Sequence, residues 1–378
     1  MPQGEGNNAS VHDADADAAV ATAVHGAPDS LFEVQPQGAR MKSITRVLTS
    51  VLFVAAFAAL QAAAPAALAA DKVTFKLDFS PVGYQAPFYA GVSRGVYAKH
   101  GLDVDIIPGN GSYPAVLDVA SGRIDFAFAD TSVLALAALK GLRDVKVVAM
   151  VFEATPYSVL YLKNKGISKP ADLAGKTEAN FTGSGVGQLF QAFARINGFS
   201  TSGIKEILSA PPTYLNPLVV GQADFAPSTV NQTVNLRGLA KQAGNDLQEF
   251  RFIDYGINIY GAAILANTKT IAEHSDVVKR FVRASLESVQ WAARHPEAAV
   301  AELRKTNPQL KKDRALAELR SILQVSIPRG ASAPDPLQLG WVDKAKMTRT
   351  VDLVRESYGL KQTVDPRALY TNAYVAKP

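Results

Sequence analysis

Cysteine is absent from the 378 residues of this chain, and its absence excludes several kinds of chemistry. Without thiols the protein forms no disulfide framework, holds no cysteine-ligated metal and carries no thiolate nucleophile. A lipidated N-terminal cysteine is excluded on the same ground. The excess of positive charge is also small: the net charge is +5, and the lysines and arginines are spread along the chain. No basic tract indicates a nucleic-acid partner.

Histidine is scarce, and its spacing does not indicate a metal site. The five histidines are His12, His25, His100, His274 and His295. His100 and His295 lie at predicted helix ends, where a solvated position is the simpler interpretation. The H-E-x-x-H pattern of zinc proteases does not occur. We therefore predict a protein that is not an enzyme and that uses no cofactor or metal.

The N-terminal part of the chain divides into two segments. Residues 1–40 are rich in Ala, Asp, Asn and Gly without apolar periodicity, which predicts a disordered extension. Residues 41–70 have a basic start, an apolar stretch and small residues before Asp71, as in a cleaved secretory signal. We predict that translation starts at Met41. An uncleaved membrane anchor is the alternative, although the apolar stretch is short for a span.

From Asp71 onward, strand-like and helix-like patterns alternate, which predicts an α/β fold with mainly parallel sheets flanked by helices. Two such blocks, each with its own glycine-rich loops, predict two lobes with a ligand between the carboxyl ends of their strands. Expected strands are residues 73–79, 102–107, 124–130, 145–152, 157–163, 204–209, 223–228, 250–256 and 260–267. Expected helices are residues 87–99 and 132–141, a helix within 182–199, and a helical region from 276 to about 358.

Four stretches together resemble the periplasmic solute-binding proteins that take up thiamine pyrimidines, sulfonates and nitrate. They are LDFSPVGYQAPFYAGVSRGVYAKHGLDVDIIPGNGS (77–112), SGRIDFAFADTS (121–132), residues 166–176 and FVRASLESVQWAARHPEAAV (281–300). The resemblance covers about residues 72–375. It implies a type II-like, two-lobed periplasmic binding protein that acts as a monomer and delivers a small molecule to an ABC transporter permease in the inner membrane.

The resemblance also implies two hinge crossings between the lobes, near Glu153–Tyr157 and near Tyr255–Tyr260. One lobe is then residues 71–155 plus 260–378, and the other is residues 156–259. Hinges of this kind absorb the backbone change when lobes close on a ligand.

Candidate ligand-binding residues of the first lobe follow its strands. They are Phe79, Ser80, Tyr84, Gln85, Asn110, Gly111, Ser112, Asp130, Thr131 and Ser132. Tyr84 has the shape to stack on a flat ligand, or it is an ordinary loop aromatic. The glycine–asparagine loop permits close backbone approach, or it is a plain turn. Thr131 or Ser132 faces the ligand or caps the following helix.

Candidates of the second lobe centre on the TGSGVG loop before a predicted helix. Its residues Gly183, Ser184, Gly185 and Val186 offer amides to a carboxylate, sulfonate or carbonyl oxygen, or simply cap the helix. Gln188 stands where a dinucleotide fingerprint has its third glycine, and the Gly-Lys-Ser/Thr ending of a phosphate loop is missing. Weaker candidates at later strand ends are Tyr214, Ser228 and Asn231.

The ligand class stays open between two alternatives. Phe79 and Tyr84 suit a flat heterocycle or aromatic, such as a pyrimidine precursor. However, Val82 and Gln85 replace the asparagine and histidine of the pyrimidine-binding branch that the chain resembles. A small sulfonate or nitrate is the alternative, but Arg94 and Arg123 lie on predicted helix surfaces rather than near the site. A sensor that presents a ligand to a membrane partner is a further possibility.

Overall fold

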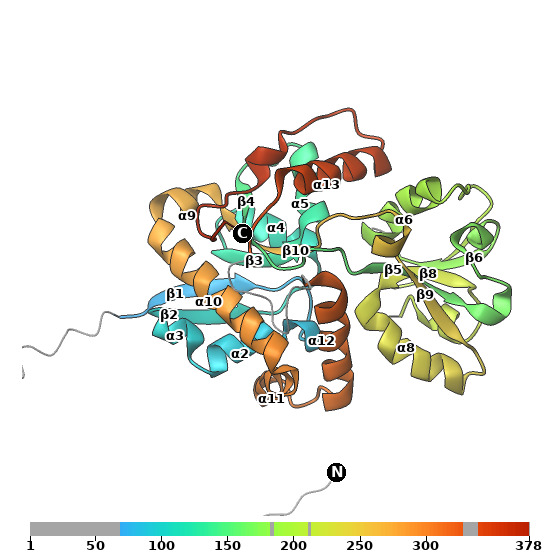
Figure 1. Cartoon of the computed structure of the whole chain (residues 1–378), viewed down its shortest axis with the longest axis horizontal. Helices are drawn as coiled ribbons and strands as arrows, with labels where there is room; N and C mark the ends of the chain where they lie inside the picture. Colours follow the sequence, from blue (N-terminus) through green and yellow to red (C-terminus); the bar gives the residue numbers. More distant parts are fainter. Residues whose placement is uncertain (1–68, 182–184, 211–212, 328–338, 378) are drawn as a thin grey trace, which may run out of the picture. The chain divides into compact units, whose positions relative to one another are not determined.

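The computed structural model describes residues 69–181, 185–210, 213–327 and 339–377. The predicted disordered extension, the body of the predicted signal peptide, Gly183 and Ser184 lie outside these ranges. The described chain forms two five-stranded sheets, ordered β2-β1-β3-β10-β4 and β7-β6-β8-β5-β9 (Figure 1). The strands are β1 Asp71–Lys76, β2 Leu102–Ile107, β3 Phe126–Asp130, β4 Val145–Met150, β5 Tyr157–Leu162, β6 Thr177–Asn180, β7 Lys205–Leu208, β8 Phe225–Thr229, β9 Leu247–Arg251 and β10 Ala262–Asn267.

Each sheet contains one strand that runs against its neighbours. In the first sheet β10 is antiparallel to both β3 and β4, whereas β1 is parallel to β2 and β3. In the second sheet β5 is antiparallel to β8 and β9, whereas β6 is parallel to β7 and β8. The mainly parallel α/β architecture predicted from the sequence is therefore confirmed, with one reversed strand in each sheet.

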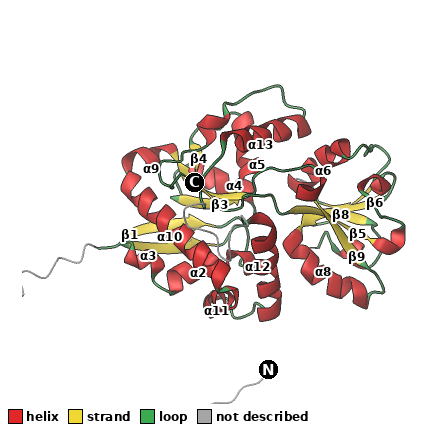
Figure 2. Ribbon diagram, viewed as in Figure 1, coloured by secondary structure: helices red, strands yellow, loops and turns green. Residues whose placement is uncertain are grey.

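Helices lie on both sides of each sheet, as Figure 2 shows. In the second sheet, alternate residues of β5 face opposite ways: Val159 packs in the cluster that includes α6, and Leu160 packs in the cluster that includes α8. The helices are α2 Ala86–Ser93, α3 Val96–Lys99, α4 Ser112–Ala120, α5 Thr131–Leu139, α6 Gly185–Ile196, α7 Asn216–Val219, α8 Val230–Gln242, α9 Thr268–Glu273, α10 Ser275–Arg294, α11 Pro296–Thr306, α12 Lys312–Ser326 and α13 Lys344–Ser357. Short 3-10 helices are η1 Gly83–Gln85, η2 Lys163–Lys165, η3 Pro170–Leu173, η4 Phe252–Tyr255 and η5 Pro366–Leu369.

The chain passes between the sheets twice, and the two connections are hydrogen-bonded to each other. The Thr155 amide donates to the Ile259 carbonyl at 3.0 Å, and the Gly261 amide donates to the Phe152 carbonyl at 2.9 Å. Each connection leads directly into a reversed strand, β5 or β10. The paired connections therefore lie at the same edge of each sheet as the carboxyl ends of its parallel strands.

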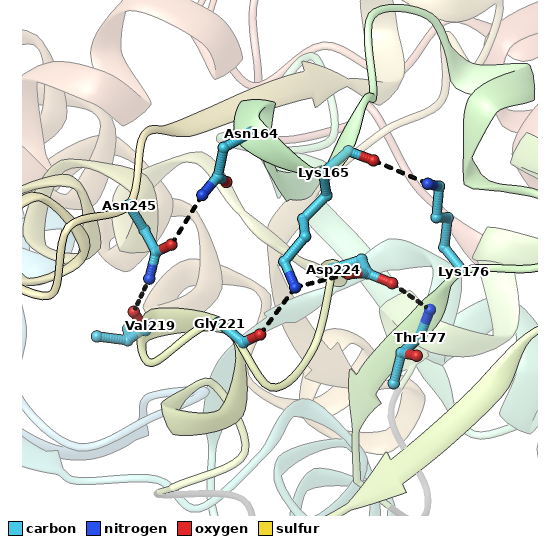
Figure 3. Close-up of polar contacts among 8 residues, drawn as sticks. All are labelled: Asn164, Lys165, Lys176, Thr177, Val219, Gly221, Asp224 and Asn245. Atoms are coloured by element: carbon cyan, nitrogen blue, oxygen red, sulfur yellow. Dashed lines mark hydrogen bonds and ion pairs between the residues drawn. The ribbon is translucent and has the colours of Figure 1, made fainter.

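The opposite ends of the strands carry an equivalent polar anchor in each sheet. Asp125, before β3, accepts from the Thr74 amide at 2.8 Å, and Asp224, before β8, accepts from the Thr177 amide at 2.9 Å. Figure 3 shows that Lys165 also reaches Asp224, at 3.4 Å, within the second sheet's network. Both aspartates belong to a Gly-x-x-Asp-Phe-Ala stretch, residues 122–127 and 221–226, so the two sheets share a local sequence as well as a topology.

Several boundaries differ from the sequence prediction. The helix predicted over 87–99 is two helices, because Gly95 takes a left-handed φ of 69° that interrupts the hydrogen bonding. The strand predicted over 250–256 is wrong in its second half, where η4 begins at Phe252; the strand itself starts earlier, at Leu247. Strand β6 and helix α8 were not predicted, because β6 is short and polar and α8 shows little amphipathic contrast.

Two glycines permit close backbone contacts beside the carboxyl ends of β1 and β2. A Cβ added to Gly109 would lie 1.8 Å from the Leu77 carbonyl oxygen, and one added to Gly83 would lie 1.9 Å from the Ala315 carbonyl oxygen. Both obstacles are backbone atoms, which have no alternative rotamer. These positions therefore require glycine for steric reasons.

We expect Gly109→Ala to destabilise the protein by at least about 1–3 kcal/mol, because the backbone of the first sheet must move to admit the methyl group. Gly238→Ala is the matched control: this glycine is exposed within α8 and no atom lies within 4 Å of its added Cβ. The control should gain up to about 1 kcal/mol in helix propensity. Urea unfolding monitored by circular dichroism measures both, and equal effects would contradict the steric argument.

Candidate functional site

The carboxyl ends of β1, β2 and β3 meet at one edge of the first sheet, where loop backbone joins them. The Gly109 amide donates to the Phe79 carbonyl at 3.0 Å, and the Gly111 amide donates to the Asp78 carbonyl at 2.7 Å. The Asp130 amide donates to Ser112 Oγ at 3.1 Å. These hydrogen bonds hold the loops after β1 and β2 and the end of β3 together. Ligands of such sheets usually bind at this carboxyl edge.

Asp78, directly beyond β1, is held by two neutral donors. Gln85 Nε2 donates to Oδ1 at 2.8 Å, and the Tyr84 hydroxyl donates to Oδ2 at 3.0 Å. Burial raises the pKa of Asp78 to about 6, and the nearby charge of Asp130 adds to the effect. The hydrogen bonds from Gln85 and Tyr84 oppose this rise without cancelling it.

Asp130 ends β3 and caps α5. Its Oδ1 accepts from the Ser132 amide at 2.8 Å, which satisfies one of the free amides at the helix start. Burial raises the pKa of Asp130, and hydrogen bonds from Ser132 and Tyr157 lower it. Asp130, rather than Thr131 or Ser132, is therefore the cap of this helix.

No lysine or arginine forms an ion pair with Asp78 or Asp130 within the ranges that the structure describes. The two arginines considered from the sequence are both exposed and engaged elsewhere. Arg94 stacks 3.7 Å from the Trp291 ring centre, and Arg123 pairs with Asp118. The site thus has two adjacent carboxylates whose described partners are all neutral.

Tyr157, the first residue of β5, brings the second sheet to Asp130. Its hydroxyl interacts with the Asp130 carboxylate and lowers the pKa of that group, and a Cβ added to Gly185 at the start of α6 would lie 3.9 Å from the same hydroxyl. Burial raises the pKa of Tyr157 well above 10, so its hydroxyl remains a proton donor. One tyrosine therefore links the carboxylate of the first sheet with the glycine-rich helix start of the second.

Two aromatic side chains are exposed beside these carboxylates. Phe79 follows Asp78 and is 46% exposed, and Tyr113 follows Ser112 at the start of α4 and is 44% exposed. Two exposed rings that follow neighbouring loops of one sheet edge offer apolar surface to a ligand bound there. Tyr84, in contrast, uses its hydroxyl on Asp78 and places its ring edge-on to Phe152 at 6.1 Å.

The structure places the other predicted residues in different roles. Gln85 and Thr131 are fully buried, and the Thr131 hydroxyl donates to the Gly261 carbonyl at 2.6 Å. Ser80, Asn110 and Gly111 lie on the loops of the site edge, with Ser80 and Asn110 exposed.

In the second sheet, two predicted residues bond to each other. The Tyr214 hydroxyl donates to Ser228 Oγ at 3.2 Å, and both side chains are buried. Val186 is also buried, whereas Gly185 is half-buried. Asn231 is buried near the start of α8.

The sequence interpretation missed Asp78, Tyr113 and Tyr157. Asp78 had a signal, since a charged residue directly after an apolar strand is at the site edge by topology. Tyr113 follows the predicted loop, but a sequence does not report exposure. The described residues contain no group of three His, Asp or Glu side chains arranged for a metal ion. No helix among them has the length and apolar character of a membrane span.

Comparisons with known proteins agree with this architecture. A family model described as NMT1/THI5-like matches residues 83–299. The formylaminopyrimidine-binding protein of Halalkalibacterium halodurans is 29% identical over 266 residues, covering 69% of this chain and 78% of that protein. The riboflavin-binding protein RibY of Chloroflexus aurantiacus is 26% identical over 337 residues, covering 84% and 91% respectively.

Among solved structures, the periplasmic aliphatic sulphonate binding protein SsuA from Escherichia coli matches with a TM-score of 0.63 and 17% identity. The match covers 82% of this chain and 92% of SsuA. At this identity the likeness concerns the fold alone. It confirms the periplasmic binding protein fold predicted from the sequence.

The raised pKa of Asp78 predicts a pH-dependent stability. The folded state holds this proton up to pH about 6, whereas the ordinary carboxyl pKa is 3.8. The stabilising contribution of the bound proton is therefore complete below about pH 4 and is lost as the pH rises through about 6, amounting to about 2–3 kcal/mol. Asp78→Asn cannot ionise and so does not lose this stability as the pH rises. The melting temperature of the variant minus that of wild type should therefore increase from about pH 4 to about pH 8.

Asp103→Asn, an exposed change on β2, is the control for this titration. Its melting temperature relative to wild type should stay constant over the same range. A constant difference for Asp78→Asn as well would show that Asp78 does not titrate as described.

Proposed function

Because the chain belongs to the NMT1/THI5-like family, we propose that it is a non-enzymatic solute-binding protein that captures a small, flat nitrogen heterocycle for an ABC importer. The support is threefold: the fold, the two relatives named for binding a formylaminopyrimidine and riboflavin, and the chemistry of the site edge. The protein works as a monomer with a permease in the inner membrane.

The pair of carboxylates, Asp78 and Asp130, carries the choice of ligand class. A group that donates hydrogen bonds or bears positive charge, such as the amino group of a heterocycle, satisfies these acceptors. A sulfonate or nitrate placed beside them is repelled, at a cost of about 4 kcal/mol per charge pair at 4 Å under the dielectric typical of a protein surface. The anion alternative is therefore the weaker one.

Exposed aromatic rings complete the proposed recognition. Phe79 and Tyr113 offer apolar faces on which a planar ring packs, and offset or edge-on aromatic contacts add about 0.5–1.5 kcal/mol each. The helix start at Gly185 adds backbone amides from the second sheet for a ring nitrogen or carbonyl oxygen. A flat ligand with an amino group and a ring acceptor satisfies all three kinds of contact.

The proposed lobes are residues 71–155 plus 260–378 and residues 156–259. Their support is the strand membership of the two sheets and the paired connections around Thr155 and Gly261. In this proposal the connections are the hinge, and the ligand is enclosed where Tyr157 links the two sheets. Backbone hydrogen bonds between the connections limit the hinge to bending.

An enzymatic role has little support. The fungal pyrimidine-making branch of the family that the sequence resembles uses a cysteine-rich iron motif, and this chain has no cysteine. Residues 91–95, GVSRG, have the spacing of a hydrolase nucleophile elbow. That motif requires a sharp turn after a strand, whereas Ser93 ends helix α2 and donates to Glu302 at 2.6 Å.

A thermal-shift screen tests the ligand class. We expect aminopyrimidines or larger amino-substituted heterocycles to raise the melting temperature by several degrees at about 100 times their Kd, and methanesulfonate and nitrate to leave it unchanged. Asp130→Asn should weaken the response at least tenfold in concentration, because hydrogen bonds to charged groups contribute about 1.5–3 kcal/mol. Asp105→Asn, exposed on β2, is the control. Stabilisation by the anions instead would overturn the proposal.

We also propose that the protein reaches the periplasm through residues 41–70, which are then removed. Expression of the full chain in a Gram-negative host, followed by periplasmic extraction and N-terminal sequencing, should give a protein that begins at Asp71. Recovery of the intact chain in the membrane fraction would favour the anchor instead.

A further inference from the structure

Glu318 on α12 is a buried carboxylate that bonds to elements of both sheets. Its side chain is 3% exposed. Oε2 accepts from the Gly83 amide at 2.8 Å, and Oε1 accepts from Asn235 Nδ2 at 2.8 Å. Arg314, one turn earlier on α12, donates to Oε1 at 2.9 Å and supplies the opposite charge. The carboxylate is therefore satisfied, as a buried charge must be.

The bond to Gly83 attaches Glu318 to the site edge of the first sheet. Gly83 begins η1, and the next two residues, Tyr84 and Gln85, are the donors that hold Asp78. The contact between η1 and α12 is direct, since a Cβ on Gly83 lies 1.9 Å from the Ala315 carbonyl oxygen. Helix α12 and the loop that holds Asp78 therefore move together.

The bond to Asn235 attaches the same carboxylate to the second sheet. Asn235 lies in α8, which follows β8 and packs on the second sheet. Another polar contact between elements of the two sheets, Arg195 with Glu356, is about half exposed on both sides. Exposed ion pairs of that kind contribute little, whereas a hydrogen bond to a buried carboxylate is strong.

We propose that Glu318 is a positioning residue that couples lobe closure to the ligand loop. In the closed arrangement it holds Asn235 and the η1 loop through one carboxylate. When the lobes separate, Glu318 keeps Gly83 and Arg314 and loses Asn235, so closure gains one charge-assisted hydrogen bond beside the site. A molecule that orders η1 thereby favours closure. This coupling depends on the proposed function for its consequence, but the hydrogen bond can be tested without any ligand.

The absence of cysteine allows two spin labels to be placed cleanly. Lys99→Cys on α3 and Gln242→Cys on α8 are exposed positions in the two sheet units, and pulsed electron resonance measures the distance between them. In this background Asn235→Asp replaces the donor with a carboxylate of the same shape that repels Glu318. We expect the ratio of short to long label separations to fall by about tenfold or more, and Asn235→Ala to act in the same direction.

Asn164→Asp is the matched control. Asn164 donates to Asn245 at 3.1 Å within the second sheet unit, so its replacement makes the same charge change without touching the first sheet (Figure 3). Its distance distribution should equal that of the parent. Equal distributions for Asn235→Asp and Asn164→Asp, or a parent protein with only the long separation, would overturn the inference. If the distances respond as expected while no heterocycle stabilises the protein, the coupling stands and the proposed ligand class falls.

Discussion

The paired backbone connections between the two sheets are the constraint on which the rest of this structure depends. Their hydrogen bonds, around Thr155 and Gly261, fix the starts of β5 and β10. Because both strands are reversed relative to their neighbours, they begin where the parallel strands end. The topology therefore brings the carboxyl edges of both sheets to the crossing point. Tyr157, as the first residue of β5, lies near both Asp130 and Gly185 because of this topology.

That arrangement explains why this edge tolerates an unfavourable grouping of charges. Burial raises the pKa of both Asp78 and Asp130, and the charge of Asp130 adds to the rise at Asp78. Neither carboxylate forms an ion pair with a basic side chain among the described residues. A chain selected for stability alone would place apolar side chains or an ion pair there. The neutral donors Tyr84, Gln85 and Ser132 hold the carboxylates in position without neutralising them. The two carboxylates therefore favour a ligand that bears positive charge or donates hydrogen bonds.

Much of the fold was predictable because β1 and β2 alternate apolar and polar residues, and because β3, β4, β5 and β10 are mainly apolar. The prediction failed where local signals were weak: β6 has only Ala179 as an apolar residue, and Gly95 divides a helix that reads as continuous. For the candidate site, the loops could be located from the ends of the strands. The burial of Gln85 and Thr131 could not be predicted. Gln85 is buried because the path of its loop brings it to Asp78, and Thr131 is buried against Gly261, which is distant in the chain.

The matching anchors at Asp125 and Asp224 lie at the ends of the sheets away from the site. Each joins the start of its third parallel strand to a neighbouring strand through hydrogen bonds that use no residue of the proposed ligand-binding edge. The end of each sheet that carries this anchor is thus separated in space from the end proposed to bind a solute. Substitutions in the loops can therefore change the ligand without disturbing the hydrogen bonds that hold the sheets together. The same shape can thereby survive a divergence as deep as the 17% identity shared with the sulphonate-binding SsuA.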